Sequence, residues 1–357
     1  MNRTCFLYLY LLIMTMLSSV CTAEGFVELR RAANLYSAPS SSSLVLGRMR
    51  AGTELIEIGG GSKQKGYWRV QNNSGLEGFV YQTLGKYTPY VPNLIYSQSD
   101  CDVHLPYGLP TTPDQLICRL GYVVGYSYQY NIPTWVAYRA DLDSANTNGA
   151  VRQDDFVVDL AVAEQNHRVG ESVYENTGYD KAHMAPPSLI DKTQLLNDQT
   201  FLMTNITPQR PWFNRDVFGN KGVWGAIEDS VACWLKTGER KEIYVISGAI
   251  VSDTPEYLGE LVAIPSGFYK IILDMESLHS IAFYIEDQEA SVNDALNLPD
   301  YITTIDAIEA ASGINVLNTL QDPIENLVEA SIGLISDWPL YDRHKSLGCV
   351  VRPAQGQ

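Results

Sequence analysis

The sequence predicts an α+β domain preceded by a small all-β domain. Residues 25–88 contain short apolar segments separated by Gly, Pro and Ser, a pattern typical of short strands joined by turns. Residues 105–350 mix strand-like segments, such as 243–248, with helix-like segments, such as 224–237. The chain of 357 residues also exceeds one average domain. We therefore expect two domains, joined by a linker over residues 89–104.

The individual segments follow from local pattern. In the first domain, Gly- and Ser-bounded apolar runs predict strands at 26–29, 33–36, 44–47, 52–58, 67–70 and 75–80. In the second domain, apolar runs rich in β-branched and aromatic residues predict strands at 121–126, 133–138, 243–248, 262–273 and 280–285. The segments 224–237 and 304–312 are expected to be helices.

The N-terminus has the layout of a cleaved secretory signal over residues 1–23. Arg3 supplies positive charge, residues 5–17 form an apolar stretch, and small residues lead to Ala23. A lipoprotein interpretation would use Cys21, but residues 18–20 are a poor lead-in for lipidation. The sequence has no second apolar run long enough to span a bilayer. We expect an exported protein, either periplasmic or secreted.

Four cysteines remain after the signal segment: Cys101, Cys118, Cys233 and Cys349. An even number in an exported chain favours disulfides over metal ligation, and the lack of a CxxC pair argues against a structural zinc site. Four cysteines allow three pairings. Proximity in sequence favours Cys101–Cys118 together with Cys233–Cys349.

The charge balance constrains the substrate. The chain has 25 basic and 41 acidic residues, a formal net charge of −16. A protein that binds polyanions normally presents a basic face. A nucleic-acid substrate would therefore have to be attracted by a local basic patch and by bound metal, with modest affinity from phosphate neutralisation.

The order of segments in residues 25–88 resembles the bacterial SH3-like domain. The matching pieces are Asn34-Leu35-Tyr36, a Pro-Ser turn, the Trp-x-x-Val segment at Trp68, and Gly78-Phe79-Val80. The resemblance implies a small barrel that binds cell-wall peptide or a protein.

A second group of residues has the composition of a phosphodiester-cleaving site. His183 lies in a short polar run followed by Pro186-Pro187, consistent with a strand that enters a turn. A neutral histidine can act as a base near physiological pH. Asn220, Trp224 and Glu228 have the spacing i, i+4 and i+8, which on a helix places them roughly on one face. An amide oxygen and a carboxylate on that face could hold a hard cation directly and through water.

These motifs resemble the signatures of the DNA/RNA non-specific endonuclease family. The run Asp180-Lys181-Ala182-His183-Met184-Ala185-Pro186 is similar to Asp-Arg-Gly-His-x-Ala-Pro. Asn205 to Gln209 match Asn-x-x-Pro-Gln, and Asn220 to Glu228 match Asn-x3-Trp-x3-Glu. A further echo is Ile264-Pro265-x2-Phe268-Tyr269-Lys270, and together the motifs extend over residues 105–345.

The resemblance implies a ββα-metal nuclease domain with a central antiparallel sheet, which cleaves DNA and RNA to 5′-phosphate products. It implies one Mg²⁺, with Mn²⁺ or another divalent cation as a substitute. His183 would be the general base, Glu228 would orient metal-bound water, and Asn220 would be the direct protein ligand of the metal. The remaining expected site residues are Arg152 and Lys181 against the phosphate, and Asp180, Asn205 and Gln209 in support.

Two departures from the family pattern leave alternatives open. Lys181-Ala182 replaces Arg-Gly, which keeps the charge but loses the bidentate contact with phosphate. An apparent insertion before Trp224 makes the metal ligand ambiguous, since counting from Pro208-Gln209 selects Asn214 and counting back from Trp224 selects Asn220. Because a loop tolerates an insertion better than a helix does, we favour Asn220.

Less specific interpretations exist for several of these residues. Arg152 could be a surface arginine in an ion pair. The other histidines, His104, His167, His279 and His344, are expected to be structural. The sequence also leaves two other functions open: a catalytically weakened protein that binds cell wall or another surface through its SH3-like domain, and a phosphodiesterase with a different substrate. Oligomeric state and the preference between DNA and RNA are left open.

Overall fold

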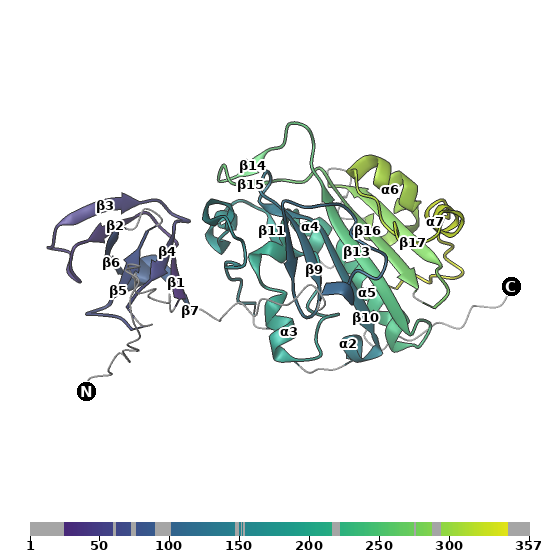
Figure 1. Ribbon diagram of the computed structural model, residues 1–357, viewed down its shortest axis with the longest axis horizontal. Coiled ribbons are helices and arrows are strands. Elements are labelled where there is room, and N and C mark those ends of the chain that lie inside the picture. Colours follow the sequence, from purple (N-terminus) through teal and green to yellow (C-terminus); the bar gives the residue numbers. More distant parts are fainter. Residues whose placement is uncertain are drawn as a thin grey trace, which may run out of the picture.

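The computed structural model describes residues 25–59, 62–72, 76–89, 101–146, 150, 152, 154–215, 222–274, 276–287 and 294–341. An all-β domain precedes a larger domain built on a long central sheet (Figure 1). The predicted signal segment, most of the predicted linker, Asn220 and Cys349 lie outside the described residues. Within the described part of the chain, no helix is both long and apolar enough to cross a membrane.

The N-terminal domain is one antiparallel sheet of seven strands. Its strands are β1 (Gly25–Leu29), β2 (Ala33–Tyr36), β3 (Val45–Met49), β4 (Glu54–Glu57), β5 (Tyr67–Gln71), β6 (Glu77–Tyr81) and β7 (Gly85–Pro89), with the 3-10 turn η1 (Gln82–Leu84) before β7. They are ordered β3-β2-β6-β5-β4-β1-β7. Its core is formed by inward-pointing side chains, among them Val27, Leu35, Val70 and Val80. The all-β prediction is confirmed, although no pairing that closes a barrel is found among the described residues.

The second domain is built on a mixed-length antiparallel sheet. It is ordered β18-β17-β16-β13-β10-β9-β8, and its strands are β8 (Gln115–Cys118), β9 (Val123–Ser127), β10 (Ile132–Asp141), β13 (Glu242–Ile250), β16 (Gly267–Asp274), β17 (Ser280–Glu286) and β18 (Ile302–Thr303). The predicted central antiparallel sheet is therefore confirmed. The single strand predicted over 262–273 is divided, because Pro265 cannot donate a ladder hydrogen bond.

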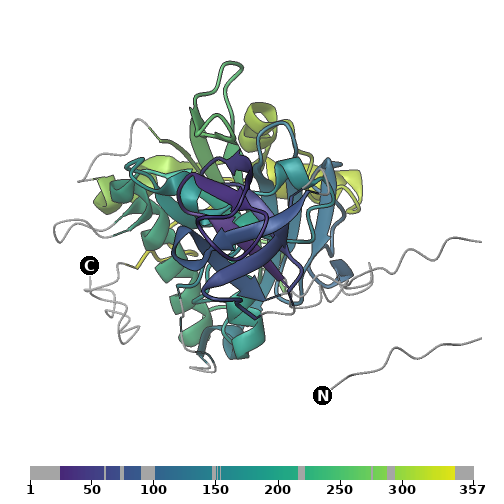
Figure 2. The same cartoon turned by 90° about the vertical axis from the view of Figure 1, so that its left-hand side faces the viewer.

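Both faces of this sheet are buried, and they carry different cores. Val124, Val136 and Val245 point to one face, whereas Val123, Ala137 and Ile246 point to the other. The first face is covered by α5 (Val223–Lys236) and by the segment that contains β11 (Asp180–His183) and β12 (Ile206–Gln209). The second face is covered by α6 (Ile305–Ser312) and α7 (Asp322–Glu329), which lie on the right in Figure 1. Figure 2 looks along the molecule from the N-terminal domain.

Shorter elements connect these layers. They are α2 (Leu142–Asn146), η2 (Gln165–His167), η3 (Glu171–Tyr174), α3 (Gln194–Gln199), η4 (Met203–Asn205), α4 (Pro211–Asn214), β14 (Tyr257–Leu258), β15 (Val262–Ala263) and η5 (Asp294–Tyr301). The helices expected at 224–237 and 304–312 are present as α5 and α6, whereas α7 was not predicted.

Disulfide bonding agrees with the predicted pairing as far as the structure describes it. Cys101 and Cys118 form a disulfide with their Cα atoms 5.4 Å apart, which ties the start of the second domain to β8. Cys233 on α5 is also disulfide-bonded. Its proposed partner, Cys349, lies outside the described residues.

Candidate active site

His183 is positioned at the end of a short two-stranded ribbon. β11 pairs with β12 in antiparallel register, with His183 opposite Ile206. Immediately after His183, the side chain of Asn205 holds the backbone of Ala185. Its Oδ1 accepts from Ala185 N at 2.9 Å and its Nδ2 donates to Ala185 O at 2.9 Å. Asn205 is fully buried, so it fixes the turn that follows the histidine.

The His183 ring lies between two aromatic side chains. Its centroid is 5.4 Å from that of Phe156 and 4.8 Å from that of Phe201. The residue is 8% exposed, and its Nε2 has no hydrogen-bond partner among the described residues. Burial, followed by the charges of Arg152 and Lys181, lowers the pKa of His183 to about 3. The imidazole is therefore neutral near physiological pH, as a base must be.

Each of the two predicted phosphate-facing cations packs on one of these aromatic rings. Lys181 Nζ is 4.3 Å from the centroid of Phe156, and Arg152 Cζ is 5.5 Å from that of Phe201. Lys181 Nζ also pairs with Glu171 Oε1 at 2.6 Å, and Arg152 Nε with Asp154 Oδ1 at 2.7 Å. Arg152 therefore makes the surface ion pair considered above and also lies near His183.

Asp180 and Asn214 meet at the edge of this site. Asp180 Oδ2 accepts from Asn214 Nδ2 at 3.1 Å and from Arg215 Nε at 2.7 Å. Together with the two cations, these residues line a cleft of about 280 Å³, whose lining includes Arg152, Phe156, Glu171, Lys181, Asn214 and Arg215. The structure thus brings Arg152, Asp180, Lys181 and Asn214 together in one cleft. Of these residues, Arg152 and Lys181 lie close enough to His183 for their charges to lower its pKa.

Behind His183, α5 supplies a buried ion pair. Trp224 Nε1 donates to His183 O at 3.1 Å, and the ammonium of Lys270 lies 3.9 Å from the centre of the Trp224 ring. Lys270 Nζ pairs with Glu228 Oε1 at 3.2 Å. Lys270 is fully buried on β16, and burial lowers its pKa, opposed by the charge of Glu228. Glu228 is thereby connected to the backbone of His183 through Lys270 and Trp224.

Lys270 is the last residue of the Ile264–Lys270 motif, but the sequence alone assigns it no role. The available signal was a lysine within the otherwise apolar run 267–273. A lysine buried in a strand requires an acidic partner, because an unpaired buried charge is very costly. Sequence order did not identify Glu228 as that partner, since 42 positions separate the two residues.

The start of helix α5 bears on the choice of the metal ligand. Helix α5 begins at Val223, and Gly222 before it is extended, with φ −71° and ψ 140°. Trp224 and Glu228 therefore share a face of α5. Asn214 is described and contacts Asp180 through its amide nitrogen, whereas Asn220 lies outside the described residues. The choice between Asn214 and Asn220 stays open.

Asp180, Asn214 and Glu228 carry carboxylate and amide oxygens, the donor type that a hard divalent cation prefers. A separate group of carboxylates, Asp306, Glu309 and Glu329, has ligand atoms within 4.8 Å of one another. These residues lie on α6 and α7 against the opposite face of the sheet, so they are not part of the His183 site.

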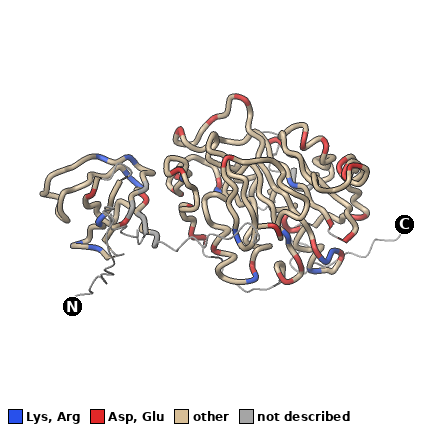
Figure 3. The backbone as a smooth tube through the Cα atoms, in the orientation of Figure 1, with Lys and Arg blue, Asp and Glu red and all other residues tan. Residues whose placement is uncertain are grey.

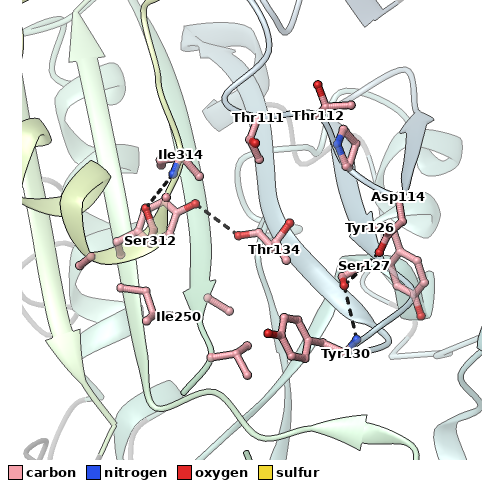
Figure 4. Close-up of a pocket in the computed structure, with 16 residues that line it drawn as sticks. Thr111, Thr112, Asp114, Tyr126, Ser127, Tyr130, Thr134, Ile250, Ser312 and Ile314 are labelled. Carbon is pink, nitrogen blue, oxygen red and sulfur yellow. Dashed lines mark hydrogen bonds between the residues drawn. The ribbon is translucent and has the colours of Figure 1, made fainter. Parts of the chain in front are cut away.

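Gln209 is fully buried opposite Asp180, and its amide has no partner among the described residues. A second cavity of about 290 Å³ is lined by hydroxyl-bearing residues, among them Thr112, Tyr130 and Thr134, and by apolar residues such as Ile250 and Ile314 (Figure 4). It contains none of the predicted site residues, so the candidate chemistry lies at His183.

Comparison with known proteins was consistent with this site. The model of the DNA/RNA non-specific endonuclease family matches residues 102–323, and that of the bacterial SH3 domain matches residues 31–86. A nuclease of Nostoc sp. is 30% identical over 260 residues, covering 68% of this chain and 90% of that protein. Human mitochondrial endonuclease G is 26% identical over 224 residues, covering 58% of this chain and 71% of that protein. A chain of the EndoG/EndoGI complex shares the fold, with a TM-score of 0.54 and 23% identity over 62% of this chain and 92% of that chain.

Proposed function

We propose that this chain, which belongs to the DNA/RNA non-specific endonuclease family, is an exported Mg²⁺-dependent endonuclease that cleaves both DNA and RNA and leaves 5′-phosphate ends. The observation that carries the proposal is the neutral, aromatic-flanked His183 with Arg152 and Lys181 packed on its two neighbouring rings.

His183 acts as the general base. Its lowered pKa keeps the imidazole unprotonated, and its Nε2 is not used by other described groups, so it can accept a proton from water. Asn205 holds the backbone turn after His183, and Trp224 holds the carbonyl of His183 itself. These contacts hold the backbone around His183, and Phe156 and Phe201 flank its ring, so that the imidazole is held in place as general-base catalysis requires.

Lys181 and Arg152 stabilise the negative charge that develops on phosphate. Both are cations at the cleft beside His183, where a phosphodiester approaching the base would lie against them. Lys181 contributes a point charge, where the family has the planar fork of arginine, so its contact with phosphate is less directional.

The metal is expected to be held by the amide oxygen of Asn220 or Asn214, with Glu228 orienting a bound water. A bound divalent cation would polarise the phosphate and lower the pKa of water. Lys270 and Trp224 determine where the Glu228 carboxylate lies relative to His183.

Export is supported by the signal-like N-terminus and by the Cys101–Cys118 disulfide, since disulfides persist in oxidising compartments. N-terminal sequencing of protein recovered from the periplasm or medium should begin at Glu24. A protein retained in the cytoplasm with an intact N-terminus would contradict export.

Catalysis is tested by digesting plasmid DNA and RNA with Mg²⁺ or EDTA. We expect His183→Ala to reduce kcat by roughly 10²- to 10⁴-fold, because the general base is lost. His279→Ala is the matched control, since His279 is exposed and outside the cleft. Intact nucleic acid with every divalent metal would overturn the proposal and favour the weakened surface-binding protein.

A further inference from the structure

The two domains of this acidic protein carry opposite charge. Residues 25–88 contain eight basic and four acidic residues, whereas residues 89–357 contain 16 basic and 36 acidic residues. The N-terminal domain is therefore positive and the catalytic domain strongly negative, as the distribution of blue and red along the tube in Figure 3 illustrates. The positive potential expected of a polyanion-binding protein is concentrated outside the catalytic domain.

Most of this positive charge is on the surface. Seven of the eight basic residues are exposed: Arg30, Arg31, Arg48, Arg50, Lys63, Lys65 and Arg69. Arg69 pairs with Glu77 at 2.9 Å, and its field is partly compensated. The eighth basic residue, Lys86, is used in the contact between the domains.

The N-terminal domain is attached to the catalytic domain by a cross-strand pair of charged residues. Glu28 on β1 is directly opposite Lys86 on β7. Glu28 is 4% exposed and accepts from Ser172 N, at 2.9 Å, in η3 of the catalytic domain. Gly170 is needed beside it, because a side chain there would collide with the Glu28 carboxylate. The contact is buried and specific to these residues.

Lys86 on β7 contacts residues that lie beside the cleft of the catalytic domain. Its Nζ donates to Phe156 O at 3.1 Å, pairs with Glu171 Oε2 at 3.4 Å, and also pairs with Asp155. Glu171 in turn pairs with Lys181, and both Phe156 and Glu171 line the cleft beside His183. The N-terminal domain therefore contacts residues of the cleft wall itself.

Three of the exposed arginines lie at this same end of the N-terminal domain. Arg30 and Arg31 directly follow β1, and Arg50 begins the turn that hydrogen-bonds to Leu29 through Gly52 N at 2.6 Å. Gly52 approaches the catalytic domain so closely that a methyl group on it would lie 3.7 Å from Ser172 Oγ. The turns that carry these arginines therefore flank the domain contact.

We propose that the SH3-like domain is a nucleic-acid-binding surface, in which Arg30, Arg31 and Arg50 bind the phosphate backbone and deliver it to the adjacent cleft. The inference rests on the proposed nuclease function and identifies where its substrate affinity comes from. Exposed arginines that contact the phosphates of a nucleic-acid backbone bind it without reading its base sequence, which suits a non-specific enzyme. An acidic catalytic domain alone would repel the same polyanion.

The test measures binding separately from cleavage. Full-length His183→Ala protein in EDTA is titrated with a fluorescent single-stranded DNA oligonucleotide across a series of salt concentrations. Adding Arg30→Gln and Arg31→Gln should weaken binding roughly tenfold at low salt and reduce the slope of log K against log salt by about one to two, since each phosphate contact releases counterions. In otherwise wild-type enzyme, the same pair should raise KM and leave kcat nearly unchanged.

The matched control is Lys192→Gln with Lys241→Gln, two exposed lysines of the catalytic domain outside the cleft lining. This pair changes the net charge equally. Equal loss of affinity in both double variants, or no loss in either, would overturn the proposal, as would binding of the arginine-containing protein to anionic lipid vesicles but not to DNA. Absence of cleavage in wild-type protein with the binding result intact would contradict only the nuclease function.

Discussion

Two lysine–glutamate pairs flank His183, one at the rim of the cleft and one behind the histidine. At the rim, Lys181 pairs with Glu171 at 2.6 Å, and both side chains are about a quarter exposed (24% and 26%). Behind the histidine, Lys270 pairs with Glu228 at 3.2 Å, and the lysine side chain is 0% exposed while the glutamate side chain is 17% exposed. The two pairs have the same chemistry but differ in their exposure to solvent.

That difference determines what each pair can do. A partly exposed pair is screened by water and salt and contributes little to stability, so a substrate phosphate can exchange with Glu171 on Lys181. A buried pair cannot lose one partner without leaving a charge in a poorly solvated site. The rim pair is therefore suited to binding substrate, and the buried pair to holding Glu228 in place.

The strongest test of this comparison is Lys270→Met. Removing the ammonium takes away the cation that pairs with the Glu228 carboxylate, and we expect the free energy of unfolding to fall by about 3 kcal/mol in urea denaturation. Adding Glu228→Gln should recover most of this loss, because the remaining amide carries no charge. A loss below about 0.5 kcal/mol in the single variant would show that the pair is effectively solvated.

The next largest effect concerns His183, which lies between the two pairs. Its folded pKa of about 3 is below the unfolded value near 6.5, so between these values the unfolded state binds more protons. Stability from this group is full above about pH 6.5 and is lost as pH falls toward 3.

His183→Ala removes this contribution. Between pH 6 and pH 4, the unfolding free energy of the wild-type protein should fall more steeply than that of His183→Ala, by up to about 1.4 kcal/mol per pH unit. Urea denaturation at several pH values measures both slopes. Parallel slopes would mean that the pKa of His183 is not lowered in the folded protein, which would contradict the burial of its ring.

The smallest effect is expected at the rim, from Glu171→Gln. The substitution removes the carboxylate that competes with phosphate for Lys181, so KM for DNA should fall roughly threefold. Unfolding free energy should change by less than about 1 kcal/mol. A higher KM would indicate instead that Glu171 orients Lys181 toward substrate, and a large loss of stability would remove the distinction between the two pairs.

The part of the site that could be predicted from sequence is the part built from contiguous residues. Asp180, Lys181 and His183 share one short strand, and Ile206 to Gln209 form the strand that pairs with it, directly after Asn205. Trp224 and Glu228 share a helix face because they are four residues apart on α5. Helix α5 begins at Val223, and Asn220 lies outside the described residues.

Local sequence determined the all-β and α+β domains and the Cys101–Cys118 disulfide, because periodicity and short spacing act within a short stretch of the chain. Only the tertiary structure determined the partners of Lys270 and Lys86, and with them the link between the basic N-terminal domain and the cleft. The reason is physical: a charge is satisfied by whichever opposite charge the fold places within reach, and that partner can be any distance away in sequence.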